Sequence, residues 1–200
     1  MSRPIEQFRD NIARIRAIHG YYLAFSQSLT PVADISDILR AEIVLLVSSL
    51  DHYVHEATRV GMIEAYDGTR PHTPAFLRYG VSIESMLQFS KGTSGSALLD
   101  SEIRTRHSLF AFQKPDKIAD AVRLYSAVDL WQQVAAELGE RAEDIKLRLK
   151  LLVERRNKIA HEADLDPSFP GTRWPITPMM VKDSTDFISR LCEAIEKSAA

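Results

Sequence analysis

The sequence predicts an all-α protein that forms a single helical bundle, with two long antiparallel helices and several shorter ones. Apolar residues recur at three- and four-residue steps along most of the 200-residue chain, which is the spacing of one helix face. Strand-like alternation never extends beyond a few residues, and we find no internal repeat or low-complexity tract. Because 200 residues suit one domain with its own core, we expect a single domain over 1–200.

The two long helices are expected in the first third of the chain. Apolar residues at helical spacing fill 5–29, and Thr30-Pro31 should end this helix. The stretch 36–66 repeats the pattern and adds a polar line on another face. Shorter or later helical patterns follow at 74–79, 82–89, 97–112, 116–125, 128–138, 141–162 and 179–197.

Glycine, serine and proline mark the breaks between these helices. The run 91–96 (KGTSGS) should form a flexible loop, and Gly139 should separate two helices. Four prolines in 167–178 predict an irregular linker before the final helix.

Composition and charge limit the setting of the protein. The net charge of -2 does not favour bulk nucleic-acid binding, so any such binding must use a local patch. A single cysteine, Cys192, excludes an internal disulfide and favours the cytoplasm. The chain starts without an apolar signal region, and its longest apolar run, 43–47, is too short to span a membrane. We expect a cytoplasmic protein without a membrane segment.

The stretch 146–161 (KLRLKLLVERRNKIAH) is the best candidate for chemistry. It carries six Lys or Arg and one acid, so it is locally basic. Arg156 falls on the apolar stripe of the predicted helix, and a charge there needs a partner, a substrate or solvent. Glu154, Asn157 and His161 lie close to one line of that helix. Two acids and Pro167 should end the helix soon after His161.

Ordinary structural roles compete with this interpretation. A histidine in the last turn of a helix is stabilised by the helix dipole without any further function. The neighbouring cations could simply form a solvated face. The same Arg-x4-His spacing also occurs at Arg14 and His19, within the first predicted helix. Context separates the two, because Arg156 is followed by a polar residue and His161 is flanked by acids.

A second polar cluster lies on the predicted helix 36–66. Asp51 and His55 are one turn apart, and His52 stands beside them. These residues could orient the catalytic candidates, hold a metal ion or form a polar network between packed helices. The spacing is a weak metal signal, and we expect no metal site.

Two stretches resemble a known superfamily. RRNKIAHEADLDP (155–167) is similar to the signature of HEPN domains, the nucleotide-binding helical domains of higher eukaryotes and prokaryotes. SSLDHYVHE (48–56) resembles the long helix of its RiboL-PSP-HEPN branch and of related bacterial HEPN nuclease families. The resemblance implies an HEPN-like helical bundle that dimerises, with two Arg-x4-6-His motifs meeting as a composite, metal-independent endoribonuclease site.

Carried over to this chain, the resemblance implies that His161 transfers the proton and that Arg156 stabilises charge on the scissile phosphate. Asn157 would orient one of these two side chains. Asp51, His55 and Glu154 would support them, and Arg155 and Lys158 would bind RNA. The residue types fit RNA cleavage through the 2′-hydroxyl, because His titrates near neutrality and Arg offers a bidentate fork. On an ideal helix Arg156 and His161 point about 140° apart, which favours a second subunit.

The resemblance leaves two functions open. One is a ribonuclease of the toxin–antitoxin or antiviral-defence type, without a cofactor, restrained by an antitoxin or a neighbour-encoded defence protein. The other is a non-catalytic HEPN module that binds RNA, a nucleotide or a partner protein. A plain helical scaffold remains if His161 proves to be buried far from any groove.

Overall fold

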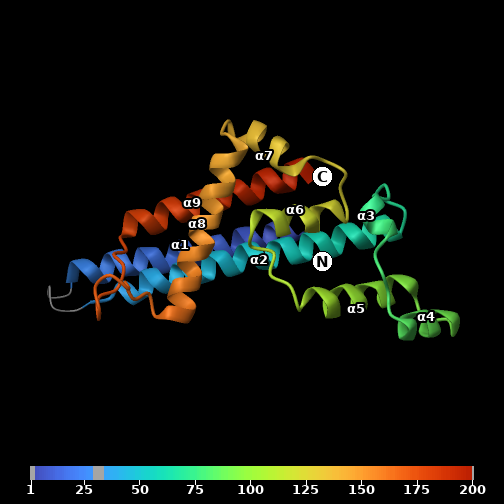
Figure 1. Cartoon of the computed structure of the whole chain (residues 1–200), viewed down its shortest axis with the longest axis horizontal. Helices are drawn as coiled ribbons and strands as arrows, with labels where there is room; N and C mark the ends of the chain where they lie inside the picture. Colours follow the sequence, from blue (N-terminus) through green and yellow to red (C-terminus); the bar gives the residue numbers. More distant parts are fainter. Residues whose placement is uncertain (1–2, 29–33, 200) are drawn as a thin grey trace.

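The computed structural model describes residues 3–28 and 34–199, and Figure 1 shows its arrangement. Nine α-helices are found in these two ranges, and no named strand occurs in them. Their bounds are α1 Pro4–Ser28, α2 Ser36–Tyr66, α3 Pro74–Leu77, α4 Ile83–Ser90, α5 Gly95–His107, α6 Pro115–Arg123, α7 Leu130–Leu138, α8 Ala142–Glu162 and α9 Pro178–Ala199. The predicted all-α fold is therefore confirmed.

Three long helices form the body of the molecule. The antiparallel pair α1 and α2 lies along the long axis, and α9 packs against both (Figure 1). Their shared interior contains the largest apolar side chains, among them Phe8, Leu46 and Leu191, each at most 1% exposed. The sequence predicted all three of these helices, although it counted only the first two as the long pair. The break expected at Thr30-Pro31 lies outside the described residues.

Helix α8 crosses this body steeply rather than lying along it (Figure 1). It packs against α2, α6 and α7, and its buried apolar residues are Ile145, Leu149, Leu152 and Val153. Gly139, with φ of 67°, ends α7 in the left-handed conformation that favours glycine and turns the chain into α8. The C-terminal turns of α8 thus emerge beside the first turns of α2.

Helix α7 packs on α9 and α8, and the other short helices lie towards the other end of α2 (Figure 1). Helices α5 and α6 pack on α2, whereas α4 packs on α5 and buries none of its residues. A small second core joins Met62 of α2 to Leu99 and Ile103 of α5.

Two predicted boundaries in this region were wrong. Helix α5 already begins at Gly95, inside the expected loop, and it ends at His107 rather than at Phe112. Turns follow at 108–110, and the backbone N–H of Phe112 then donates to the Asp51 carboxylate at 2.6 Å. This bond pins 108–112 to α2 as an irregular segment.

Candidate active site

Helix α8 remains regular until Glu162 and then ends abruptly. Ala163 and Asp164 both have positive φ, at 51° and 60°, a conformation that non-glycine residues rarely adopt. The amide of Asp164 donates to the carbonyl of Lys158 at 3.0 Å, which closes the helix end. This reversal directs the Asp164 side chain back under the helix that carries the candidate motif.

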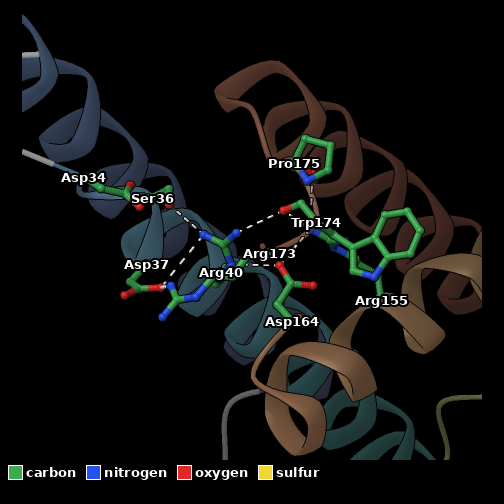
Figure 2. Close-up of polar contacts among 9 residues, drawn as sticks. All are labelled: Asp34, Ser36, Asp37, Arg40, Arg155, Asp164, Arg173, Trp174 and Pro175. Atoms are coloured by element: carbon green, nitrogen blue, oxygen red, sulfur yellow. Dashed lines mark hydrogen bonds and ion pairs between the residues drawn. The ribbon is translucent and has the colours of Figure 1, made fainter. Parts of the chain in front are cut away.

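The carboxylate of Asp164 holds α8 to α2 (Figure 2). Its Oδ2 accepts from Nε of Arg40, on α2, and from an Nη of Arg155, on α8, each at 2.8 Å. Asp164 is fully buried, and a buried carboxylate needs charged partners of this kind. The end of α8 is therefore fixed relative to α2 by an ion triad.

Trp174 completes the same cluster from the linker before α9. Its carbonyl accepts from Arg40 at 3.0 Å and from Arg155 at 3.2 Å, and its amide donates to the Asp164 carbonyl at 2.9 Å. The ammonium of Lys158 lies 4.9 Å from the centre of the Trp174 ring, within cation–π range. The proline-rich linker thus folds back onto the helix end.

These contacts engage one Nη of the Arg155 guanidinium, whereas its Nε is buried without a hydrogen-bond partner in the described ranges. This Nη donates to Asp164 and to the carbonyls of Trp174 and Pro175, all within one subunit. Burial lowers the pKa of Arg155 from the ordinary arginine value, while Asp164 acts in the opposite direction. RNA binding by Arg155 stays a prediction, and its contacts here position the helix end.

The candidate catalytic residues lie just outside this cluster. Arg156 is half-buried, and its Nε is buried without a hydrogen-bond partner in the described ranges. Asn157 and Lys158 are also half-buried, whereas His161 is exposed in the last turn of α8. The structure therefore presents His161 to solvent on a helix end that is held firmly.

The supporting residues predicted on α2 do not meet this motif. Asp51 accepts the Phe112 amide, and its other oxygen lies 3.8 Å from Nε2 of His55. The His55 ring packs against Phe112 with centroids 4.5 Å apart. Eleven residues separate Arg40 from Asp51 on α2, which is about 16 Å along the helix axis. Asp51 and His55 form a packing network of their own.

Glu154 and the second Arg-x4-His pair also have local partners. Exposed Glu154 lies 3.8 Å from Lys150 in an ion pair along α8. His19 hydrogen-bonds Glu42 at 2.9 Å, between α1 and α2. Burial raises the pKa of the Glu42 carboxyl, and the bond to His19 acts against that rise. His19 therefore serves packing, unlike the exposed His161.

Comparison with known proteins identifies the fold family. The model of the RiboL-PSP-HEPN family matches residues 9–200. The chain belongs to this HEPN family. Searches of curated proteins and of solved structures found no match. Membership indicates a function of ribonuclease or RNA-binding type.

Within this HEPN domain, sequence reasoning missed Arg40, Asp164 and Trp174. A signal was present for Arg40, because it lies beside Leu39 and near Ile43 on the buried face of α2. A charge on such a face requires a partner. Asp164 was taken only as a helix terminator, since its inward direction depends on the positive φ of Ala163.

Neither a membrane span nor a metal cluster is evident in the parts of the HEPN chain that the structure describes. No helix there has the length and apolarity needed to cross a bilayer. No group of three or more His, Cys, Asp or Glu side chains there could hold a metal ion.

Proposed function

We propose that this HEPN protein is a metal-independent endoribonuclease whose site is completed by a second copy of the chain. His161 transfers the proton, Arg156 stabilises charge on the scissile phosphate, and Asn157 orients one of these groups. RNA is the substrate, and the working unit is a homodimer.

The regular course of α8 through Glu162 is the observation that carries this proposal. Because the helix does not unwind, Arg156 and His161 leave it about 140° apart. One subunit therefore does not bring both side chains onto the same phosphate. If a second α8 packs against the first, Arg156 of one subunit and His161 of the other can approach the same phosphate from different sides. His161 is exposed and can therefore reach such an interface.

The chemistry of the residues supports cleavage through the ribose itself. The 2′-oxygen forms a bond to phosphorus while the bond from phosphorus to the 5′-oxygen breaks, leaving a 2′,3′-cyclic phosphate. One group takes the 2′-hydroxyl proton and another gives a proton to the leaving oxygen, and imidazole suits both because it titrates near neutrality. Two copies of His161 at one interface provide these two groups. Arg156 supplies a fixed cation for the pentavalent phosphate.

The ion triad supports the same proposal by holding the site. Arg40 and Arg155 fix Asp164, and Asp164 lies three residues after His161. A group that transfers protons must be held within hydrogen-bond reach of the reacting atoms. We assign Arg155 to positioning and leave Lys158, whose ammonium rests on Trp174, as an additional RNA contact.

The biological setting follows from this activity. We propose a toxin or antiviral-defence role in the cytoplasm, with an antitoxin or neighbour-encoded protein controlling it.

Cleavage of RNA in EDTA tests the proposal. The wild-type protein should cut unpaired RNA and leave cyclic-phosphate ends, and Arg156→Ala and His161→Ala should each reduce the rate by at least about a hundredfold. Exposed Arg141→Ala and His52→Ala serve as matched controls and should cut normally. Binding of RNA without any cutting would favour the non-catalytic HEPN module. RNA cleavage that persists in both variants would show that it does not depend on Arg156 and His161, and would overturn the proposal.

A further inference from the structure

A basic track with an aromatic end lies on the face formed by α6 and α8. One hollow of about 480 Å³ lies between these helices, and a second of about 390 Å³ lies between α6 and the segment that follows α5. The two hollows meet at Asp120 of α6, which lines both. They lie on adjoining faces of α6 and share this residue.

Cations dominate this surface in a chain of net charge -2. Only two carboxylates, Asp116 and Asp120, line the two hollows. Six cationic side chains line them, and these define the basic track: Arg78, Arg106, Lys117, Arg123, Lys146 and Lys150. Lys117 and Arg123 pair with Asp120, Lys146 pairs with Glu143, and Lys150 pairs with Glu154. Six cations against these three acids and Asp116 leave a local excess of two positive charges. Such a local excess attracts a polyanion even though the whole chain is slightly acidic.

The track leads directly to the candidate catalytic motif. Lys150 and His161 are eleven residues apart on α8, which places them within about 20° of the same line along the helix. The distance between them along the axis is about 16 Å. A strand that contacts Lys150 is therefore on the same face of α8 as His161, and between them it passes exposed Glu154, which pairs with Lys150 at 3.8 Å.

Aromatic side chains form the far end of the track. Phe110 is 56% exposed, and its ring lies 6.3 Å from His107 and 6.2 Å from Phe112. The guanidinium of Arg106 lies 5.1 Å above the Tyr79 ring in the same wall. An exposed aromatic ring at the end of a cationic groove is the arrangement that stacks unpaired bases.

The wall of this aromatic end also contains polar atoms without partners in the described ranges. His107 is 5% exposed, and its Nδ1 has no hydrogen-bond partner. The hydroxyl of Tyr79 is likewise buried without a partner. Both side chains line the same hollow as Phe110, so its wall has a neutral polar character at this end. A nucleobase carries donors and acceptors of this neutral type.

We propose that the basic track binds an unpaired RNA strand, with one base stacked on Phe110 and the backbone running over Lys117 and Lys146 towards His161. This inference rests on the proposed function for the choice of RNA, but binding to the track does not require catalysis. It makes single-stranded RNA the substrate class, because a base held in a duplex is not free to stack on a side chain.

Fluorescence anisotropy in EDTA, with the full chain carrying His161→Ala, tests the track without cleavage. The probes are a labelled oligoribonucleotide that cannot self-pair and a hairpin duplex of equal charge. Phe110→Ala should weaken binding of the unpaired strand about tenfold and leave duplex binding unchanged. Its matched control is Leu109→Ala, the 84% exposed neighbour, which should bind normally.

Salt dependence tests the cationic part of the track. Lys117→Gln with Lys146→Gln should lower the slope of log K against log salt by about 1.4, or about 0.7 for each phosphate contact. Lys182→Gln with Lys197→Gln, both on α9, is the matched double control and should keep the slope.

Three results would overturn the proposal that the basic track binds RNA. They are equal binding by the Phe110 and Leu109 variants, equal slopes for the two lysine pairs, and displacement of the RNA by polyglutamate of equal charge. Failure of the nuclease gives a different pattern, in which RNA binding depends on Phe110 but the wild-type protein does not cut.

Discussion

Arg155 donates to Asp164 at 2.8 Å, so the helix that carries the candidate motif is tied to the chain segment that ends it. Arg40 reaches the same carboxylate oxygen from α2 at the same distance. A carboxylate buried with two cations stabilises the fold only while all three groups are present. Removing one of them leaves a buried charge without its partner, which destabilises the folded state.

Asp164→Asn tests this triad. The substitution keeps the size of the side chain but leaves Arg40 and Arg155 facing each other without the charge between them. We expect the free energy of unfolding, measured by urea denaturation, to fall by about 3–5 kcal/mol. Exposed Asp183→Asn is the control and should change it by less than about 0.5 kcal/mol. Equal stability of the two variants would mean that the triad does not hold the helix end.

The substitution Asp51→Ala distinguishes a packing role of Asp51 from a role in supporting the catalytic residues. Loss of the acceptor for the Phe112 amide should cost about 1–3 kcal/mol of stability in urea denaturation. The cleavage rate of the folded protein should not change, because Asp51 contacts 108–112 rather than the motif. His52→Ala, on the exposed side of the same turn, is the control. A reduced rate under conditions where the variant is fully folded would restore a supporting role for Asp51.

His107 should make stability depend on acid pH. Burial, with repulsion from His55 and Arg106, lowers the pKa of His107 to about 4 from its ordinary 6.5. The folded protein therefore binds this proton less readily than the unfolded chain, so the contribution is complete above pH 6.5 and is lost as the pH falls towards 4. The shift corresponds to about 3 kcal/mol.

The comparison of wild type with His107→Gln isolates that contribution from other titrating groups. Urea denaturation between pH 7 and pH 4 should show a smaller loss of stability on acidification in the variant than in the wild type. Parallel curves for the two proteins would show that His107 is protonated equally well in both states.

Replacing two helical glycines by alanine should change the stability of the protein in opposite directions. A Cβ at Gly61 of α2 would lie 2.5 Å from the Tyr125 ring, so Gly61→Ala should cost about 1–3 kcal/mol. A Cβ at Gly20 of α1 would meet nothing within 4 Å, so Gly20→Ala should stabilise the protein by about 0.5–1 kcal/mol. Thermal unfolding measures both, and a stabilising Gly61→Ala would show that α2 and Tyr125 are packed loosely.

The fold was largely readable from the sequence because helical periodicity is a local property. The end of α8 is an example, since the acids and Pro167 that follow His161 predicted a stop, and the helix ends at Glu162. The extent of α5 was not readable, because the segment that follows it is bonded to Asp51, sixty-one residues away from Phe112 in sequence.

The candidate site shows the same division between local and long-range information. The pattern of Arg156 and His161 could be found in the sequence, and the choice of His161 over His19 agrees with their surroundings, exposed in one case and bonded to Glu42 in the other. The different surroundings of Arg155 and Arg156 could not be predicted. They depend on Asp164 turning inward through positive φ and on Arg40 arriving from another helix.

The separation of the two copies of α8 in the proposed dimer tests the shared site most directly. Exposed Glu162→Cys accepts a spin label beside His161, while Cys192 is buried and stays unlabelled. Double electron–electron resonance should then give one narrow distribution between subunits, shorter than the length of α8, which is about 31 Å for its 21 residues. A longer separation, or no dipolar signal from a sample that is dimeric by light scattering, would contradict a composite site built on His161.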